Sequence, residues 1–440
     1  MLQKLFKLRE NNTTLSQEAI GGITTFMTMA YIIFVQPAVL SAAGMDFGAV
    51  MIATCVSSAL ATFLMAFLAN YPIALAPAMG HNFFFVYTIC LAMGVPWQTA
   101  LGANFISGAA FVILSVFGLR EMLVNAIPDS LKQAIAVGIG LFIALIGFQW
   151  AGIVVYNPGT VVGLGSLHSP PVLLAIFGIV VITILYTLRV KGAIVLGIVI
   201  TALVGIPFGI VKYHGVISAP PSPLPTLLKL DIGGALTLSL LPTIFILFFL
   251  DLFDTVGTLI GVSEQAGFVK EGKLPRARSA LLSDAIGTVF GTITGTSTVT
   301  SYIESSTGVA SGARTGLANI FTGILFLVAL LFYPLVKMIG GGVAIEGGFL
   351  YPVTAPALII VGTLMMSGVT KIKWHDFSEA IPAFLTIVIM PYAFSITEGI
   401  AVGFIFYVLL KLVTGKIKEV HLILIIFAIL FVLRYIFLMR

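Results

Sequence analysis

The chain has 440 residues, of which 59% are hydrophobic and only 9% are charged, and its formal net charge is +5. Soluble domains carry about 25% charged residues, so this composition excludes an ordinary soluble domain. The basic residues are spread among short loops, which argues against a nucleic-acid partner. Apolar stretches of about 20 residues, the length that crosses a lipid bilayer, run from residue 18 almost to the end. We therefore predict an all-α polytopic membrane protein.

The first ten residues, MLQKLFKLRE, are basic and amphipathic and lack a cleavage site, so we expect a retained cytoplasmic helix and not a signal peptide. Fourteen helical spans follow in the apolar pattern, and a further apolar stretch covers 421–438. The spans are predicted at 18–40, 49–69, 72–92, 98–118, 131–150, 170–188, 192–211, 235–260, 279–295, 298–312, 316–337, 351–369, 378–395 and 397–414.

The third span contains helix-breaking residues. Pro72, Pro77 and Gly80 remove or weaken helical hydrogen bonds, and Asn82 follows directly. Irregular backbone at membrane depth is tolerated only where it is buried in protein or faces water. We therefore expect a binding role for the backbone at 76–80, although Asn82 could instead serve only to satisfy freed backbone groups.

The positive-inside rule orients the chain. With a cytoplasmic N-terminus, the basic loops fall on the cytoplasmic side, whereas the 151–169 connection, with only His168, fits the outside. We predict a multi-pass protein of the cell membrane. The residues assigned to cytoplasmic loops are Arg120, Lys132, Arg189, Lys191, Lys270, Lys273, Arg276, Arg278, Lys371 and Lys373.

The two halves of the chain resemble each other. Segment 191–209 parallels 398–415, and the broken third span parallels the polar tenth. Seven spans per half is an odd number, so the halves insert with opposite orientation, which is typical of secondary transporters. The predicted division is a first repeat at 1–211, an extracellular Pro-rich linker at 212–234, a second repeat at 235–415, and an apolar helix at 416–440 of open placement.

Carboxylates inside spans are costly and mark functional sites. Asp251 and Asp254 lie three residues apart in the eighth span, where each could also be a structural hydrogen-bond partner. Glu304 lies in the Ser-, Thr- and Gly-rich run 287–316, and the β-branched TSTVTSYI before it favours a short extended piece over a helix. Glu304 is therefore the leading candidate for a binding residue.

Metal and enzyme chemistry are not expected. Cys55 and Cys90 lie in apolar segments, the five histidines have no ligand spacing, and neither paired metal-binding acids nor a nucleophile–base pair occurs. We expect no metal, no cofactor and no enzymatic activity. Glycines 138, 140 and 147 in the fifth span and 362 and 368 in the twelfth are expected on a sliding surface, with ordinary close packing as the alternative.

Several segments together resemble the nucleobase/cation symporter-2 family, and within it the AzgA-like branch of adenine, guanine and hypoxanthine permeases. The likeness extends over nearly the whole chain. It is carried by GGITTFMTMAYIIFVQPAVL at 21–40, APAMGHNFFFVY at 76–87, FFLDLFDTVGTLIGV at 248–262, GTSTVTSYIESSTGVASGARTGL at 295–317 and EAIPAFLTIVIMPYAFSITEGIAVGF at 379–404.

This resemblance implies a UraA-like fold of 14 transmembrane spans as 7+7 inverted repeats, with short extended segments interrupting spans 3 and 10. It also implies a core domain of spans 1–4 and 8–11 and a gate domain of spans 5–7 and 12–14. The family's base-binding acids and asparagine correspond to Asp251, Glu304 and Asn82. The chain departs from the branch's usual pattern at Ala78, His81 and Phe83–Phe84, which leaves the purine preference open.

The function that the resemblance implies is import of a purine base by proton symport with an elevator-like motion. Glu304 would accept from two adjacent base donors, and an aromatic ring such as Phe84 would stack on the base. Asp251, Asp254 or Glu304 would carry the proton, because burial raises the pKa of a carboxyl. A uracil/xanthine permease and an anion transporter of the same fold stay open as alternatives, as do Na⁺ coupling and a homodimer. The backbone groups expected to bind the base are those of Ala78, Gly80, Thr300, Ser301 and Tyr302.

Overall fold

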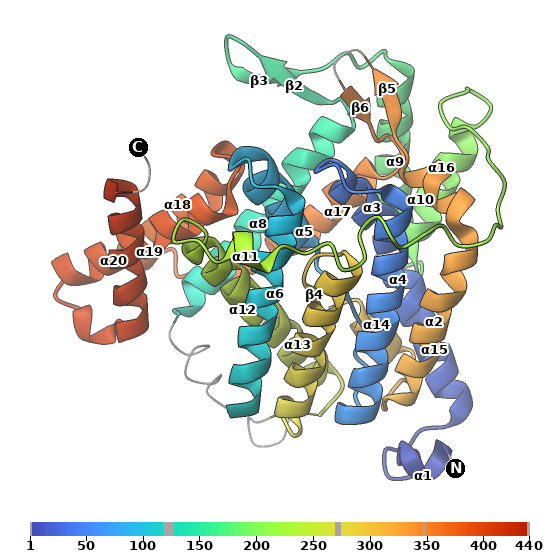
Figure 1. The fold of residues 1–440 in the computed structure, drawn as a ribbon, viewed down its shortest axis with the longest axis horizontal. Coiled ribbons are helices and arrows are strands. Elements are labelled where there is room, and N and C mark those ends of the chain that lie inside the picture. Colours follow the sequence, from blue (N-terminus) through green and yellow to red (C-terminus); the bar gives the residue numbers. More distant parts are fainter. Residues whose placement is uncertain (1, 118–126, 269–273, 346–347, 438–440) are drawn as a thin grey trace.

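The computed structural model describes residues 2–117, 127–268, 274–345 and 348–437 (Figure 1). Arg120, Lys270 and Lys273 lie outside these ranges. Within these described ranges, eight helices are long and apolar enough to cross a membrane, and five shorter apolar helices accompany them. The structure therefore has the helical, multi-pass architecture that the composition predicts, while the count of fourteen spans stays a prediction.

The first half of the chain is helical apart from one short strand and one hairpin. Its elements are α1 (Leu2–Leu5), α2 (Leu15–Met29), α3 (Ile32–Ser41), α4 (Phe47–Leu64), η1 (Met65–Ala69), β1 (Leu75–Pro77), α5 (Met79–Phe83), η2 (Phe84–Ala92), α6 (Trp97–Phe117), α8 (Asp129–Trp150), β2 (Val154–Asn157), β3 (Val161–Leu164), α9 (Pro170–Thr187) and α10 (Ala193–Gly205).

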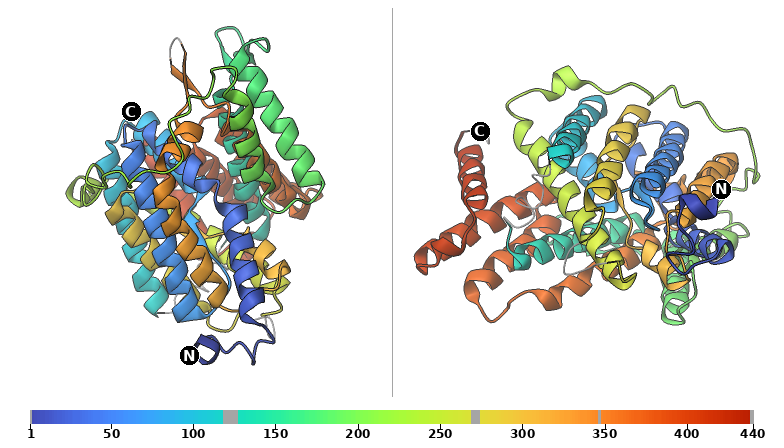
Figure 2. Two further views of the ribbon diagram at one scale, coloured as in Figure 1. Left: turned by 90° about the vertical axis from the view of Figure 1, so that its right-hand side faces the viewer. Right: turned by 90° about the horizontal axis from the view of Figure 1, so that it is seen from below.

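The second half follows a long connection that crosses the outside of the molecule (Figure 2). Its elements are α11 (Ile232–Ala235), α12 (Leu241–Gln265), α13 (Ala277–Thr294), β4 (Val299–Ser301), α14 (Ser305–Ala310), α15 (Leu317–Ala329), η3 (Leu330–Phe332), α16 (Tyr333–Gly340), β5 (Val343–Ile345), β6 (Gly348–Leu350), α17 (Ala355–Met365), η4 (Met366–Lys371), α18 (Phe377–Tyr392), α19 (Ile396–Val413), η5 (Ile417–Glu419) and α20 (Leu422–Phe437).

Two predicted boundaries are wrong. The span expected at 192–211 ends at Gly205, two residues before Pro207, which has no N–H to continue the helical hydrogen bonds. The span expected at 235–260 begins only at Leu241, with Pro242 in its first turn, where a missing N–H costs nothing. The preceding α11 is a separate short helix, capped by Asp231.

The helices pack in two groups, which we name the core group (α2–α6 with η1, β1 and η2, and α12–α16 with β4) and the gate group (α8–α10 and α17–α19). Within each group helices from both halves of the chain interleave, such as α2 with α15 in the core group and α8 with α17 in the gate group. Contacts between the groups are far fewer.

Glycines let the gate helices α8 and α17 approach closely. A Cβ on Gly140 would lie 2.8 Å from the carbonyl oxygen of Gly362, and one on Gly362 would lie 2.5 Å from the oxygen of Gly140. Gly138 and Gly147 likewise pack against α18 and α17. The prediction that Gly138, Gly140, Gly147 and Gly362 lie on a sliding surface is therefore wrong, because their neighbours belong to the same group. The alternative, close packing of helices, holds for them.

The C-terminal helix α20 bridges the two groups at one edge of the molecule (Figure 1). Arg434 pairs with Glu398 of α19 at 2.8 Å, and Tyr435 donates to the same carboxylate. On the core side, the ring of Phe427 stacks on Phe245 of α12 with centroids 3.7 Å apart. These contacts place the helix that the sequence left unassigned.

Candidate functional site

Two three-residue strands meet at the centre of the core group. Strands β1 and β4 pair antiparallel, with Ala76 opposite Thr300. The pairing extends by one hydrogen bond at each end, from Ala78 N to Thr298 O at 2.9 Å and from Tyr302 N to Ala74 O at 3.0 Å. Both strands are fully buried, so the breaks in spans 3 and 10 form one small sheet inside the membrane protein.

Glycine allows the chain to enter β4. Gly295 ends α13 with φ +103°, in the left-handed region. A Cβ there would lie 2.2 Å from the Cβ of Thr226, a clash that no side chain avoids. Gly295 therefore fixes the turn from helix to strand.

A threonine from a neighbouring helix brackets each strand. Thr62 Oγ1 of α4 donates to Leu75 O at 3.1 Å and accepts from Leu75 N at 3.0 Å. Thr288 Oγ1 of α13 lies in the same relation to Val299, at 2.9 Å to its oxygen and 3.1 Å from its nitrogen. The two halves thus use one device to satisfy strand groups that face away from the partner strand.

Replacing Thr62 or Thr288 by Val keeps the side-chain volume but removes both hydrogen bonds. Buried backbone groups left unsatisfied cost about 1–3 kcal/mol, so each variant is expected to lower thermal stability and to weaken ligand binding at the strands about tenfold. Melting in detergent and equilibrium binding measure the two effects. Thr370→Val, at an exposed hydroxyl of η4, is the control. Equal losses of stability and of binding in all three variants would contradict the proposed role of Thr62 and Thr288 in holding the strands.

Further buried polar side chains hold the strand ends, and sequence reasoning missed them. Asp284 Oδ1 accepts from Ser301 N at 3.0 Å, and Asn104 Oδ1 accepts from Thr298 Oγ1 at 2.6 Å. Asn319 Nδ2 donates to two carbonyls just before β1, at 2.8 and 3.0 Å. The sequence does contain a signal for them, since each is an isolated polar residue in an apolar span. This signal identifies the residue but not its hydrogen-bond partner.

Glu304 lies directly after β4, where α14 begins. Tyr31, the residue directly before α3, donates its hydroxyl to Glu304 Oε1 at 2.6 Å. The same glutamate is one of the residues that line a cavity. Tyr302 beside it donates to Pro77 O and thereby ties β4 to the end of β1. Sequence reasoning found Glu304 but not Tyr31.

Asp254 of α12 lies close enough to Glu304 and to Tyr302 to interact with both electrostatically. Its Oδ2 accepts from Thr300 Oγ1 at 3.3 Å and lies 3.9 Å from Nδ1 of His81. The Asp254 side chain is 44% exposed, whereas the His81 side chain is 3% exposed. Neither ring nitrogen of His81 has a hydrogen-bond partner within the described part of the chain.

Asp251 is placed differently from Asp254. It is fully buried, and its Oδ2 lies 3.4 Å from Oγ1 of Thr288, the residue that brackets β4. Asn82 is also fully buried and donates to Gln36 Oε1 at 2.7 Å; Gln36 in turn donates to Thr296 and Ser297 before β4. Asp251 and Asn82 thus contact Thr288 and Gln36, the residues that hold β4 and the segment before it.

Two other predicted residues face packed surroundings. The ring of Phe84 is fully buried, so it offers no stacking surface in this conformation. Gly80 lies at the contact between the groups, where a Cβ would come within 3.0 Å of Ile139 of α8. We therefore expect that an aromatic ring can stack on a bound base only after the gate group has moved.

A cavity of about 980 Å³ separates the core group from the gate group and ends at Glu304. Its walls include the first turns of α8, the α9–α10 turn (188–192) and η4. These chain segments lie on the side where α2 begins, which we call the N-terminal face. The cavity therefore opens from Glu304 toward the N-terminal face.

The α9–α10 turn lies unusually deep against the core group. Gly192 packs against Met27, with its Cβ position 3.2 Å from Met27 O, and Met27 is near the middle of the 27-residue span Leu15–Ser41. In Figure 2 the paired helices α9 and α10 correspondingly extend past the core group on the opposite face. The α9–α10 turn of the gate group therefore lies beside the middle of a core-group span.

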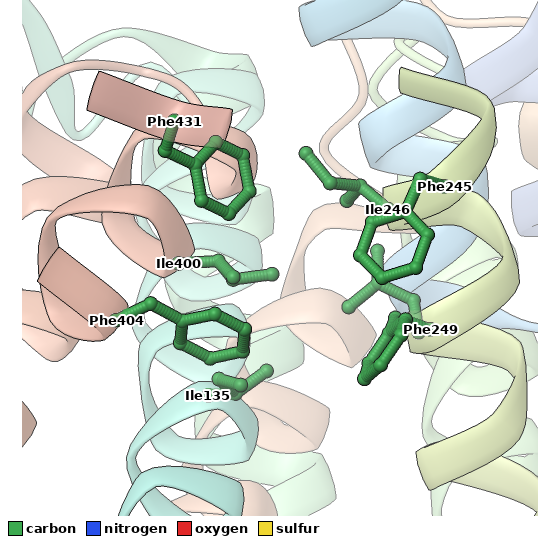
Figure 3. A pocket seen from close by; sticks show the side chains of 8 residues that line it. Ile135, Phe245, Ile246, Phe249, Ile400, Phe404 and Phe431 are labelled. Carbon is green, nitrogen blue, oxygen red and sulfur yellow. The ribbon is translucent and has the colours of Figure 1, made fainter. Parts of the chain in front are cut away.

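A second pocket lies between α12 and the gate group and is entirely apolar (Figure 3). Ile135, Ile400, Phe404 and Phe431 face Phe245, Ile246 and Phe249 across it. Its lining has no polar group that could recognise a polar ligand, so we interpret it as an apolar contact between the core group and the gate group. Within the described ranges, no cluster of three or more His, Cys, Asp or Glu side chains could hold a metal ion.

Residues 16–402 match the profile of the Permease family. The chain is 51% identical to a putative permease, MJ0326, of Methanocaldococcus jannaschii, over 99% of this chain and 98% of that protein. It is 46% identical to the guanine/hypoxanthine permease PbuG of Bacillus subtilis (99% and 100% covered) and 45% identical to the adenine permease AdeP of Escherichia coli (99% and 96% covered).

Solved structures show the same fold at low sequence identity. The transmembrane domain of a cyanobacterial bicarbonate transporter, BicA, superposes with a TM-score of 0.65 at 15% identity, over 88% of this chain and 97% of that one. SLC26A9 gives a TM-score of 0.62 at 12% identity, over 91% of this chain and 66% of that one. The fold of the chain is therefore the UraA-like transporter fold.

Proposed function

Because the chain belongs to the Permease family of nucleobase/cation symporters, we propose that this transporter carries purine nucleobases into the cell. The adenine and the guanine/hypoxanthine permeases that resemble it over nearly their full length support a purine substrate.

The observation that carries the proposal is Glu304 at the junction of the strand pair and the open cavity. A carboxylate there accepts two adjacent N–H donors of a purine edge, and charge-assisted bonds of this kind are about twice as strong as neutral ones. The backbone N–H groups of Ala78 and Tyr302 are already used in the strand pairing, so we do not count them as ligands of the base. A cavity of about 980 Å³ admits a base with room to spare.

We further propose proton coupling through Asp254. It lies beside Glu304, and His81 is the titratable neighbour on its other side. A proton on Asp254 removes repulsion between two carboxylates, so the protonated site binds a base better, and this differential affinity is what coupling requires. Asp376, outside the spans, is excluded, because hydrogen bonds from Ser378 lower its pKa to about 2 and keep it ionised.

The cavity between the core group and the gate group supports an elevator-like motion. If the N-terminal face is cytoplasmic, as the basic residues at 189, 191 and 371 favour, the present conformation is open to the cytoplasm. Sliding the core group past the gate group would move Glu304 to the other side, with the apolar contact of Figure 3 as the moving surface.

An anion transporter of this fold is the second candidate, since the solved relatives by fold include bicarbonate and SLC26-type transporters. A site for an anion would need a cation or helix N-termini without a facing acid. Asp254 and Glu304 both face the strand site, which disfavours an anionic substrate.

Uptake of radiolabelled hypoxanthine, guanine and adenine into cells without their own permeases tests the proposal. We expect saturable uptake of at least one of these three bases, blocked by excess of another of the three and little affected by excess uracil, xanthine or bicarbonate. Uptake blocked by uracil or xanthine would instead assign the protein to the uracil/xanthine permeases. Uptake of bicarbonate alone would overturn the proposal of a nucleobase substrate.

A further inference from the structure

We propose that the open cavity also binds a purine nucleoside monophosphate, with the base at Glu304 and the phosphate at the cationic mouth, and that this ligand inhibits transport from the N-terminal face. The inference rests on the proposed function, because it uses the same base site.

The charges along the cavity favour an anion at its mouth. Three cationic side chains, Arg189, Lys191 and Lys371, line it, and Glu304 at its inner end is the acidic residue among the described lining. A free base needs only the inner end, so the cations and most of the 980 Å³ are left unused by the transported molecule. A phosphate on the sugar side of the base would neutralise part of this charge.

A polar track connects the two ends. Glu304, Thr307 and Ser311 lie three and four residues apart on one side of the α14 segment, and the hydroxyl of Thr28 lies 3.0 Å from that of Thr307. Lys191 Nζ donates to Ser311 Oγ at 2.8 Å. Seven residues of helical rise separate Glu304 from Ser311, about 10 Å. This separation suits a molecule with a base at one end, a sugar between and a phosphate at the other.

The cations belong to an ordered turn. Arg189 has φ +57°, and Val190 N donates to Leu185 O at 3.0 Å, which closes the end of α9. Gly192 then packs against Met27, so the turn is anchored on the core group. Arg189 and Lys191 are therefore presented at fixed positions beside the cavity.

The ligand would act as an inhibitor and not as a substrate. Its base would bind the core group while its phosphate bound Arg189, Lys191 and Lys371 of the gate group. Joining the two groups opposes the sliding that transport needs. A doubly charged phosphate also cannot follow the base into an apolar, closed site without a large desolvation cost.

Competition binding on the purified protein in uncharged detergent tests this proposal. The bound probe is labelled guanine, or whichever labelled purine binds, and the competitors are its free base, its nucleoside, its 5′-monophosphate and inorganic phosphate. We expect the monophosphate to compete at least ten times better than the nucleoside and to weaken as salt is added. Inorganic phosphate alone should leave the base in place.

Arg189→Gln/Lys371→Gln is the decisive variant, and it keeps the Lys191–Ser311 contact. We expect its monophosphate affinity to fall at least tenfold while its affinity for the free base stays within twofold. Lys337→Gln, on a cavity at the opposite face, is the matched control and should change neither.

Equal competition by nucleoside and monophosphate, or a monophosphate affinity unchanged in the double variant, would overturn the inference and leave the base site intact. If no labelled base binds wild type, the proposed function itself fails, and the two failures are thereby distinguished. A loss of both affinities in the double variant would contradict the separate phosphate position.

Discussion

Replacing Glu304 by Gln is expected to lower the affinity for a purine base about 100-fold and to abolish uptake. The change keeps the shape but presents an amide donor to the base donors and removes the negative charge. A hydrogen bond to a charged group contributes about 1.5–3 kcal/mol, and each 1.4 kcal/mol is tenfold in affinity. Equilibrium binding of labelled base to purified protein measures the effect.

The control for this variant is Glu10→Gln, whose carboxylate is 69% exposed and far from the strands. It should bind and transport as wild type does. Tyr31→Phe, which removes only the hydroxyl that donates to Glu304, should weaken binding by a smaller factor. Wild-type affinity in folded Glu304→Gln protein would show that the base binds elsewhere.

Replacing Asp254 by Asn is expected to remove the dependence of uptake on pH, because the amide cannot take up a proton. In wild type, protonation of Asp254 relieves repulsion with Glu304, so uptake should rise as the pH outside falls and decline as it rises. Asn is permanently neutral, so base binding should persist while an imposed proton gradient no longer accelerates uptake. Proteoliposomes with imposed gradients measure this.

Asp251→Asn is the matched comparison, since Asp251 lies about one turn away on α12 but contacts Thr288 of α13. It should lower stability or binding strength while leaving the pH dependence in place. A gradient response lost in Asp251→Asn and retained in Asp254→Asn would reverse the assignment of the coupling residue.

Much of the architecture was predictable from single-residue signals. Apolar length gave the helical spans, and Pro77 with the β-branched residues around Thr300 predicted extended backbone where β1 and β4 lie. Glu304 and Asp254 were predicted because a carboxylate in an apolar span rarely occurs without a function. These features depend only on local sequence.

The partners of these residues could not be predicted. Tyr31 is 273 positions from Glu304, and Gln36 is 46 positions from Asn82, so their contacts depend on how helix faces meet in space. The same limit explains why Asp251 and Asp254, one helical turn apart, could not be separated. It also explains the placement of glycines such as Gly140 within the gate group and not on its surface.

The position of a bound base tests the account most directly. A structure of the protein determined with guanine or hypoxanthine bound should place the purine edge within hydrogen-bond distance of Glu304, against the ends of β1 and β4. A base found in the apolar pocket between α12 and α19, or at the cavity mouth away from Glu304, would contradict the account.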